Sequence, residues 1–354
     1  MRSNWSSPRY SKTKVDYAGK VLVGYFNTQN DISEDNKSVH DAFVILNNWR
    51  SAHSYPLFVF QRDLRKYARK ITNRALVVQR LKRIKSIIKK LRRTQTQTMN
   101  LSQMQDIGGC RVILEDIKEV NKFYNIYTKR KTKHKLIKEK NYITSPKLDG
   151  YRGVHLIYRY KGQITSKFDG LLIEIQIRSK LQHAWATAVE TVDIFTNQSL
   201  KTDEGNSEWI EFFKLVSSAF ALMEETKLIH ETPNDKEELR NKIREKITNL
   251  NIFEKMESWR ILIGKTDKRS DSAFFLLKLD SSSGTTYITE FKRSQEKIAV
   301  KSYNQTEEKN NKNTNIISVL VAASSLKEVK KAYPNYLADT SEFIKAVNRF
   351  LDRY

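Results

Sequence analysis

One strand-forming segment constrains the fold more than any other feature of this chain. In LLIEIQIRSKLQHAWA, residues 171–186, isoleucines at alternate positions are separated by Glu174, Gln176 and Arg178. Alternation with a period of two predicts a strand with one buried face and one open face. A helix is predicted directly after it, from Lys180 to Thr196. With the other predicted elements, this indicates an α/β or α+β fold, a mixed sheet of about five strands flanked by helices.

The open face of this strand carries side chains suited to chemistry. A strand with a purely structural role rarely exposes a carboxylate, an amide and a guanidinium together. A carboxylate on a rigid strand can bind Mg²⁺ or take a proton from an attacking hydroxyl. We therefore predict that Glu174 is catalytic, with Gln176 and Arg178 on the same face.

Asp106 is a second candidate carboxylate. In QMQDIGGCRVIL it precedes a strand predicted over Cys110–Leu114. The glycines at 108 and 109 allow a ligand to approach the backbone closely. Local evidence gives equal weight to two interpretations of Asp106, a turn or capping residue and a functional one.

The charge of the chain indicates an anionic partner. The 64 Lys and Arg residues against 40 Asp and Glu give a net charge of +24, and nucleic acid is the first candidate for such a partner. The cations are concentrated between Arg62 and Arg93, where Asp63 is the one acid, and again over Lys129–Lys140. A solvated basic surface would explain the lysines but not the arginines before residue 94, so we expect part of this charge to be functional.

Several classes of protein are excluded by composition. No run of about 18 apolar residues is present, and the N-terminus lacks the apolar segment of a secretory signal. The single cysteine, Cys110, excludes an internal disulfide framework and a cysteine-rich metal site. The six histidines show no metal-ligand spacing. We expect a cytoplasmic protein without a membrane segment.

The chain divides into three predicted parts. Residues 1–37 form a polar extension with little order, residues 38–258 form the main domain, and residues 259–354 form a small α+β domain. In the main domain we predict helices over Ser38–Lys70, Arg74–Arg93, Ile117–Lys129, Glu208–Glu225 and Lys236–Trp259, and strands over His155–Tyr160 and Leu171–Arg178. In the small domain we predict strands over Ile261–Gly264, Ser272–Leu279, Thr285–Phe291, Ile298–Tyr303 and Ile316–Val321, a flexible loop over 306–315, and helices over Ser325–Lys331 and Ser341–Arg353.

The loop SPKLDGYRGVHL supplies a third group of candidates. The Asp149-Gly150 pair predicts a turn that leads into a strand. Two cations, Lys147 and Arg152, stand with an aromatic ring, Tyr151, and an imidazole, His155. This set suits an anionic ligand with a flat ring, such as a nucleotide. A solvated hairpin tip is the alternative for the segment taken alone.

Four segments in order and spacing, RDLRKYARK…QRLKRIKSI, QDIGGCRVI, SPKLDGYRGVHL and EIQIRSKLQHAWA, closely resemble the RelA/SpoT-type nucleotide pyrophosphokinase domain. The resemblance covers residues 40–225 approximately. It implies transfer of the β,γ-pyrophosphate of ATP to a ribose 3′-hydroxyl, with release of AMP, and Mg²⁺ as cofactor.

The resemblance also assigns roles by position. It implies ATP-phosphate contacts from Arg80, Lys82, Lys90 and Arg111, Mg²⁺ ligands in Asp106 and Glu174, and acceptor contacts from Lys147, Tyr151, His155, Gln176 and Arg178. In the family the tyrosine stacks on the acceptor base, and the glutamate activates the acceptor hydroxyl.

Three departures from the family pattern matter. Asp149 stands where the family usually has Asn, and a fixed anion there would repel the phosphates of free GDP or GTP. Thr191 stands where many members carry His. The sequence shows no upstream hydrolase domain, so we expect no built-in reversal of the reaction.

The segment KKAYPNYLADT near the C-terminus raises the question of control. Tyr333 and Tyr336 flank a turn at Pro334-Asn335, and packing into the core of the small domain is the simplest local interpretation. The segment also resembles the C-terminal domain of CapRel-like fused toxin–antitoxin synthetases. That resemblance implies a Tyr-x-x-Tyr element that occludes the ATP site, a phage protein that relieves the block, and the 3′-CCA end of tRNA as acceptor.

We therefore interpret the chain as a tRNA pyrophosphokinase toxin with a fused antitoxin, in which Tyr333 and Tyr336 lie over Arg80 and Lys82. One alternative is a (p)ppGpp or (p)ppApp synthetase that uses GDP, GTP or ADP as acceptor. A second alternative, from another class, is a non-catalytic nucleic-acid-binding sensor.

Overall fold

The computed structural model describes residues 5–27, 36–93, 99–196, 207–258, 262–263, 272–280, 282–283, 285–310, 315–337 and 339–353. Within these ranges no helix is both long enough and apolar enough to cross a membrane. The predicted domain boundary near residue 258 falls at the end of a described range, and Trp259 lies outside the described residues.

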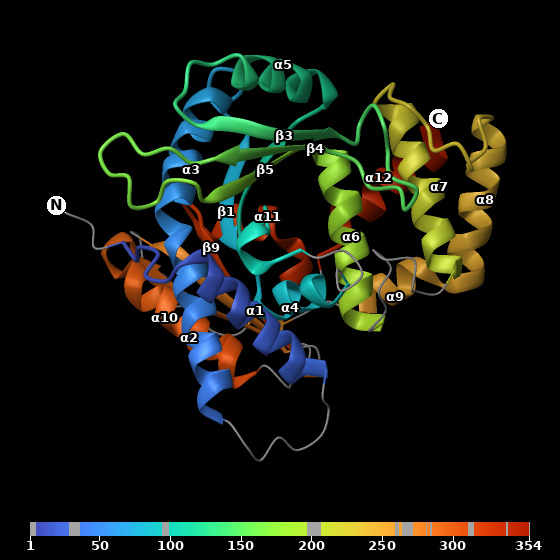
Figure 1. Ribbon diagram of the computed structural model, residues 1–354. Helices are drawn as coiled ribbons and strands as arrows, with labels where there is room; N and C mark the ends of the chain where they lie inside the picture. The colour runs from blue at the N-terminus through green and yellow to red at the C-terminus, as the bar shows by residue number, and fades with distance from the viewer. Residues whose placement is uncertain are drawn as a thin grey trace.

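One mixed sheet runs through the molecule in the order β3-β4-β5-β2-β1-β9-β7-β8-β6 (Figure 1). Its strands are β1 (Leu76–Leu81), β2 (Gly108–Leu114), β3 (Lys135–Asn141), β4 (Val154–Arg159), β5 (Leu172–Ser179), β6 (Leu262–Ile263), β7 (Ser272–Asp280), β8 (Thr285–Lys292) and β9 (Ile316–Ala322). The prediction of a mixed α+β fold is confirmed. The predicted number of strands was too low, because β9 pairs with β1 at Gln79↔Ala322 and Arg80↔Val321 and continues the sheet into the C-terminal strands.

Helices flank this sheet (Figure 1). They are α1 (Lys12–Asn27), α2 (Asn36–Ala52), α3 (Ser54–Ala68), α4 (Ile84–Arg93), α5 (Ile117–Thr128), α6 (Lys180–Thr196), α7 (Ser207–Met223), α8 (Lys236–Leu250), α9 (Ile252–Ser258), α10 (Glu296–Lys309), α11 (Leu326–Ala332) and α12 (Ser341–Arg353), with short 3₁₀ turns at Leu101–Gln103, Arg293–Gln295 and Pro334–Leu337 (η5).

The segment predicted as a single helix over Arg74–Arg93 is instead a strand followed by a helix. Residues 77–79 of β1 are all buried, because β2 and β9 flank the strand and both faces of the sheet are covered there. A strand buried on both faces loses the alternation that reveals it in a sequence. Only the second half has a helical stripe, with residues 84, 87, 88 and 91 of α4 buried.

Other predicted boundaries also change. The polar extension contains α1, which buries Val15, Ala18 and Leu22. The segment Ile298–Tyr303, predicted as a strand, belongs to α10, whose buried residues are spaced four apart at 299, 303 and 307. That helix also takes in the start of the predicted loop at 306–315, and residues 311–314 lie outside the described ranges. The helix predicted over Lys236–Trp259 is interrupted at Asn251, which takes φ 49°.

The register of the sheet separates two faces. Glu174 pairs with Gly109, which pairs with Arg80, and Gln176 pairs with Arg111, so these side chains share one face, called here the site face. The isoleucines of β5 point to the opposite face, the back face, where they join a core with α3, α5 and α10. On the site face of β7, β8 and β9 a separate apolar core includes Tyr333 and Tyr336.

The last helix is built into the helical group beside the sheet. In Figure 1, α12 lies with α6, α7 and α8 on the right of the molecule. Phe343 of α12 is buried, and its ring centroid lies 6.2, 5.8 and 5.9 Å from those of Phe212, Phe213 and Phe220. The C-terminal helix therefore completes a core that the earlier helices leave open.

We expect Phe343→Ala to lower the free energy of unfolding by about 3–5 kcal/mol, because it empties a buried aromatic position. Chemical denaturation of the full chain measures the change. Val44→Ala, at a position that is 42% exposed, is the control and should change stability little. Equal stability of the two variants would contradict the assignment of α12 to this core.

Candidate functional site

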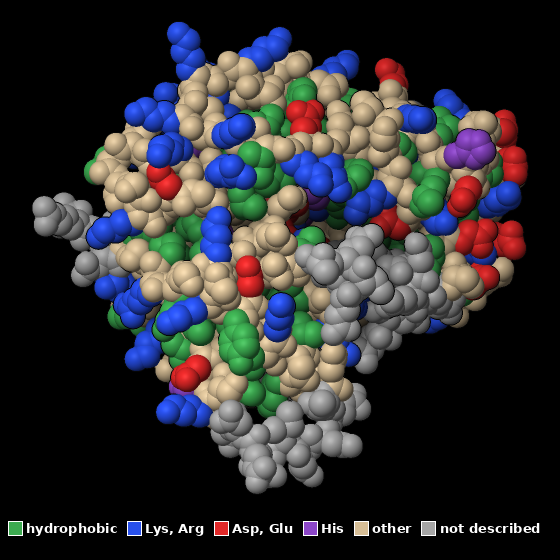
Figure 2. All heavy atoms as spheres, viewed as in Figure 1, with side chains coloured by type: hydrophobic (Ala, Val, Ile, Leu, Met, Phe, Trp, Pro, Cys, Tyr) green, Lys and Arg blue, Asp and Glu red, His purple; other side chains and the backbone are tan. Residues whose placement is uncertain are grey.

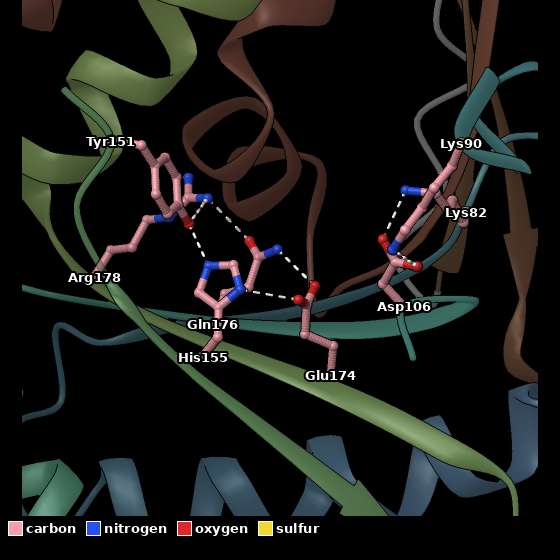
Figure 3. Close-up of polar contacts among 8 residues, drawn as sticks. All are labelled: Lys82, Lys90, Asp106, Tyr151, His155, Glu174, Gln176 and Arg178. Atoms are coloured by element: carbon pink, nitrogen blue, oxygen red, sulfur yellow. Dashed lines mark hydrogen bonds and ion pairs between the residues drawn. The ribbon is translucent and has the colours of Figure 1, made fainter. Parts of the chain in front are cut away.

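Four side chains surround Glu174 in a closed ring of hydrogen bonds (Figure 3). His155 Nδ1 lies 2.9 Å from Glu174 Oε1, and Gln176 Nε2 donates to Glu174 Oε2 at 2.8 Å. Arg178 Nη2 donates to Gln176 Oε1 at 3.1 Å and to the Tyr151 hydroxyl at 2.7 Å. The Tyr151 hydroxyl in turn meets His155 Nε2.

The direction of each hydrogen bond in this ring follows from its chemistry. Arg178 can only donate, so Tyr151 Oη and Gln176 Oε1 accept from it. Because the Glu174 carboxylate only accepts, His155 donates to it from Nδ1; a neutral His155 accepts at Nε2 from the Tyr151 hydroxyl, and a protonated one donates to that hydroxyl. Glu174 accepts at both oxygens, as an ionised carboxylate does. The ring thus places a proton on His155 Nδ1 and fixes the amide orientation of Gln176.

The ring also governs the ionisation of Glu174. Burial alone would raise the pKa of this carboxyl, but the hydrogen bond and charge of His155, with the bond from Gln176, outweigh it and hold the pKa at about 2. Glu174 is therefore an anion at neutral pH.

The loop before β4 brings the side chain of Tyr151 to the edge of the hydrogen-bonded ring around Glu174. Lys147 Nζ lies 5.0 Å from the ring centroid of Tyr142 and 5.1 Å from that of Tyr151. Asp149 Oδ1 accepts a hydrogen bond from the Tyr151 amide at 2.8 Å. Gly150 takes φ 94°, a backbone conformation in which a residue with a side chain would be strained. Asp149 therefore fixes the turn that presents Tyr151.

Arg152 does not join this group, although its sequence position suggested a second cation for a ligand. Its side chain is buried and donates from Nε to Ser217 Oγ of α7 at 2.9 Å. Ser217 Oγ also donates to the Gly150 carbonyl at 2.6 Å. Burial lowers the pKa of Arg152 to about 10, against the opposing charge of Glu224. Arg152 and Ser217 therefore anchor the loop from behind.

A second cluster lies around Asp106, beyond the N-terminal end of β2 (Figure 3). Lys82 Nζ is 2.8 Å from Asp106 Oδ2, and Lys90 Nζ is 3.0 Å from Oδ1. Burial would raise the pKa of Asp106, but the two ammonium groups outweigh it and lower the pKa below its ordinary value. Asp106 is thus an ion-paired carboxylate two residues before β2.

Tyr333 covers two arginines of the site face. Its ring centroid lies 5.8 Å from Arg80 Cζ and 5.2 Å from Arg111 Cζ. The expected partner Lys82 is replaced by Arg111, because the Lys82 ammonium is bound to Asp106. Tyr336 is buried beside Tyr333, with the two ring centroids 6.3 Å apart.

The backbone next to Tyr333 meets the same group. Arg111 Nη1 donates to the Ala332 carbonyl at 3.1 Å, and His183 Nε2 lies 3.1 Å from the Lys331 carbonyl. Burial, then the nearby charge of Arg178, lowers the pKa of Arg111 to about 10. The C-terminal segment therefore occupies the arginine-lined part of the site face.

Sequence reasoning missed two members of the site. His183 of α6 follows β5 by four residues in the LQHAW segment, which was quoted but not assigned a role. Tyr142 meets Tyr151 and His155 edge-on, at centroid distances of 5.7 and 5.3 Å. No sequence pattern marks Tyr142, since it follows a lysine-rich edge strand.

The two carboxylates fit a metal that arrives with a nucleotide. The negative charge of Glu174 acts to raise the pKa of Asp106, so the two groups lie within electrostatic reach of each other. Mg²⁺ is usually held by one or two carboxylates together with water and substrate phosphates. Among the described residues no group of three or more His, Cys, Asp or Glu side chains forms a complete protein cage for a metal.

The basic segment Lys129–Lys140 divides into a structural and an exposed part. Arg130 is buried, with its Nε 2.8 Å from Asp63 Oδ2 and its Nη1 donating to the Tyr127 carbonyl at 2.7 Å. The lysines of the segment are exposed and lie along and before the edge strand β3: Lys129, Lys131, Lys133, Lys135, Lys138 and Lys140. In Figure 2, Lys and Arg side chains are spread over the face that is shown and gather beside the hollow near its centre.

Comparison with known proteins points to one family. Residues 79–195 match the family described as the region found in RelA / SpoT proteins. Two Bacillus subtilis proteins named GTP pyrophosphokinase, YjbM and YwaC, are each 32% identical over 111 residues, which cover 31% and 30% of this chain and 52% of each relative. The chain thus spans about half the length of these relatives.

Solved structures of the same kind are also similar. Small alarmone synthetase 1 from Bacillus subtilis, bound to its product pppGpp, aligns with 49% of this chain and 89% of its own, at 22% identity and a TM-score of 0.43. A GTP pyrophosphokinase family protein from Streptococcus pneumoniae aligns with 56% of this chain and 92% of its own, at 23% identity and a TM-score of 0.40.

Proposed function

We propose that this chain, whose residues 79–195 form a RelA/SpoT-type synthetase region, is an ATP-dependent pyrophosphokinase. The observation that carries the proposal is the pairing of two ionised carboxylates with opposite surroundings. Asp106 is held by ammonium groups, and Glu174 is held by the polar ring that includes Tyr151. Such a site has cations for a triphosphate on one side and an aromatic ring for a nucleoside on the other.

In the proposed reaction the 3′ oxygen of the acceptor attacks the β-phosphorus of ATP. The bond from that phosphorus to the oxygen shared with the α-phosphorus breaks, AMP leaves, and the hydroxyl proton passes through Glu174 to solvent. Lys82, Lys90 and the arginines at 80 and 111 bind the phosphates, and Lys147 and Tyr151 hold the acceptor nucleotide. Pyrophosphoryl transfer depends mainly on such positioning and charge stabilisation.

Mg²⁺, when bound, would neutralise phosphate charge, and Asp106 and Glu174 are the residues that would hold it. Both carboxylates now accept bonds from protein donors. Lys82 and Lys90 hold Asp106, and His155 and Gln176 hold Glu174.

Glu174→Gln should lower transfer at least about 100-fold while ATP binding remains, because it removes the anion and keeps the shape. Purified full chain is incubated with labelled ATP and, separately, tRNA, GDP, GTP or ADP, and labelled products are separated. Glu139→Gln, on the opposite face of β3 where Tyr124 binds it, is the control. Transfer at the parent rate by Glu174→Gln would refute the assignment of this site.

We infer that the acceptor is the 3′ end of tRNA. Lys140 pairs with His155 and Lys138 with Ile157, so both lysines share the site face with Glu174. A strand rises about 3.3 Å per residue, so the row from Lys140 back to Lys135 extends about 17 Å from the ring, and Lys133 and Lys131 are exposed in the segment just before it. A free nucleotide reaches only the near end of this row, whereas a polynucleotide spans it.

Reversing charge at Lys131 and Lys133 should weaken modification of tRNA and make its salt dependence shallower, by about two in the logarithmic slope. Reaction with a free nucleotide should not change. Lys227 and Lys236, which are exposed near α8, are reversed as the matched control. Arg130 is left intact, because its ion pair with Asp63 is structural. Full activity on tRNA with an unchanged salt dependence would contradict the proposed role of these lysines in binding tRNA.

A second candidate acceptor is a free guanosine nucleotide, which would make the chain an alarmone synthetase. The observation in its favour is that the two relatives are named GTP pyrophosphokinases. The anionic side chain of Asp149 in the acceptor loop weighs against it. The acceptor panel described above separates the two candidates, since a product formed only with GDP or GTP would select the second.

We further propose that the C-terminal region inhibits the enzyme at rest. Tyr333 covers Arg80 and Arg111, two of the cations assigned to ATP, and backbone carbonyls of residues 331 and 332 bind His183 and Arg111. A phage-derived protein that binds this region better when it is undocked would shift the equilibrium towards the active form.

Tyr333→Leu should raise basal activity about tenfold or more, because it keeps apolar volume in the core but removes a ring face from two desolvated guanidinium groups. Tyr333→Phe keeps the ring and is the matched control, and it should stay inhibited. Product formation without any trigger measures both variants, after their melting temperatures have been compared. A Tyr333→Leu variant that folds normally and is no more active than Tyr333→Phe would rule out this mode of inhibition.

A further inference from the structure

The turn that carries Lys82 is held from three sides by backbone hydrogen bonds. The Lys82 amide donates to the Ile107 carbonyl at 2.8 Å, next to Asp106. The Lys82 carbonyl accepts from Arg50 Nε at 3.1 Å. Two residues on, the Ile84 amide at the start of α4 donates to Glu307 Oε2 at 2.8 Å.

Two of these three supports depend on α10, in the C-terminal region. Glu307 belongs to α10, is buried, and also accepts from Ser318 Oγ of β9. Arg50 is fully buried on α2. Its Nη1 donates to Asn47 Oδ1 of the same helix at 3.1 Å and to Asn304 Oδ1 of α10 at 3.3 Å, and the ring centroid of Tyr303 of α10 lies 4.9 Å from Cζ. One face of α10 thus fixes the turn at residues 82–84.

Glu307 reaches α4 from the back face of the sheet. Side chains alternate along β9, so Ser318 points to the same face as Leu320, which belongs to the back-face core. Val319 and Val321 point to the other face and belong to the site-face core. The carboxylate therefore lies on the side of the sheet away from Glu174. It does not stand in for a phosphate in the site, and its charge favours the N-terminal end of α4.

The position of α4 determines both partners of Asp106. Lys82 lies two residues before the helix, and Lys90 lies about two turns into it, and their ammonium groups hold the two oxygens of Asp106. A shift of the turn would move Lys82 relative to Asp106 and would move α4 with Lys90. The support from α10 is therefore transmitted to the donor side of the site.

We propose that Glu307, together with Arg50, is a positioning residue for the donor site, so that the C-terminal region both inhibits through Tyr333 and assembles the site through α10. This inference rests on the proposed function for its meaning. It requires the active form to keep α10 in place while the segment around Tyr333 leaves the arginines. Complete release of the C-terminal region would lower ATP affinity.

The test uses the full chain in a Tyr333→Leu background, which removes competition at the arginines. Glu307→Ala should weaken binding of a non-hydrolysable ATP analogue with Mg²⁺ by about threefold to tenfold, and Glu307→Gln, which keeps an acceptor for the Ile84 amide, should restore part of that loss. Glu308→Gln, one residue on in the same helix, is the control and should bind as the parent does. Unchanged or tighter binding by a folded Glu307→Ala variant would overturn the proposal.

A second readout does not depend on the reaction. Lys82 is paired with Asp106 and should react slowly with an amine-modifying reagent, while Lys138 is exposed and should react fast. Glu307→Ala, or Glu307→Gln if the alanine variant does not fold, should speed modification of Lys82 several-fold with no change at Lys138. If the proposed function fails, the parent makes no product with any acceptor, but this readout still decides the role of Glu307, and an unchanged rate at Lys82 refutes it.

Discussion

The parallel pairing of β2 with β5 is the constraint on which the rest of the site depends. It sets Gly109 beside Glu174 and Arg111 beside Gln176. Since Asp106 immediately precedes β2, this register also brings the second carboxylate near the first. A parallel pair needs a long connection, and the chain uses it to build α5, β3 and β4, which return His155 and Tyr151 to the same face. The position of the loop that carries Tyr151 therefore depends on this one pairing.

Concentrating cations on one face costs stability, and the structure offsets that cost in two ways. The Asp106 carboxylate compensates Lys82 and Lys90, whereas aromatic rings lie over arginines: Tyr151 over Arg178 at 4.9 Å and Tyr333 over Arg80 and Arg111. An ion pair and a cation–π contact differ in what is left behind when a ligand displaces the protein partner. A triphosphate can displace a neutral ring from a guanidinium without leaving a buried charge unpaired, so the arginines are the easier part of the site to cover and uncover.

The sequence predicts the site better than it predicts the sheet. The strand with Glu174, Gln176 and Arg178 and the helix Lys180–Thr196 were evident because a single buried face leaves a clear period of two or 3.6. The sequence predicts a helix where β1 lies, because β1 is buried on both faces and shows no alternation. It predicts no strand at β3, because this edge strand is rich in lysine. The interaction of Arg130 with Asp63 and the mutual position of Arg111 and Ala332 join residues far apart in the chain, and no local pattern encodes such contacts.

The C-terminal region, predicted as a small α+β domain over residues 259–354, makes several contacts with the rest of the fold that no local pattern encodes. Its composition changes after residue 258, but its strand β9 pairs with β1, Glu307 of its helix α10 accepts from the Ile84 amide, and α12 completes the core around Phe343. Between α10 and α12 lies the segment α11–η5, which carries Tyr333. Its flanking elements are anchored to different parts of the main fold, so this segment can move only as a loop held at both ends. The proposed control by this segment therefore needs a small displacement over two arginines rather than the departure of a domain.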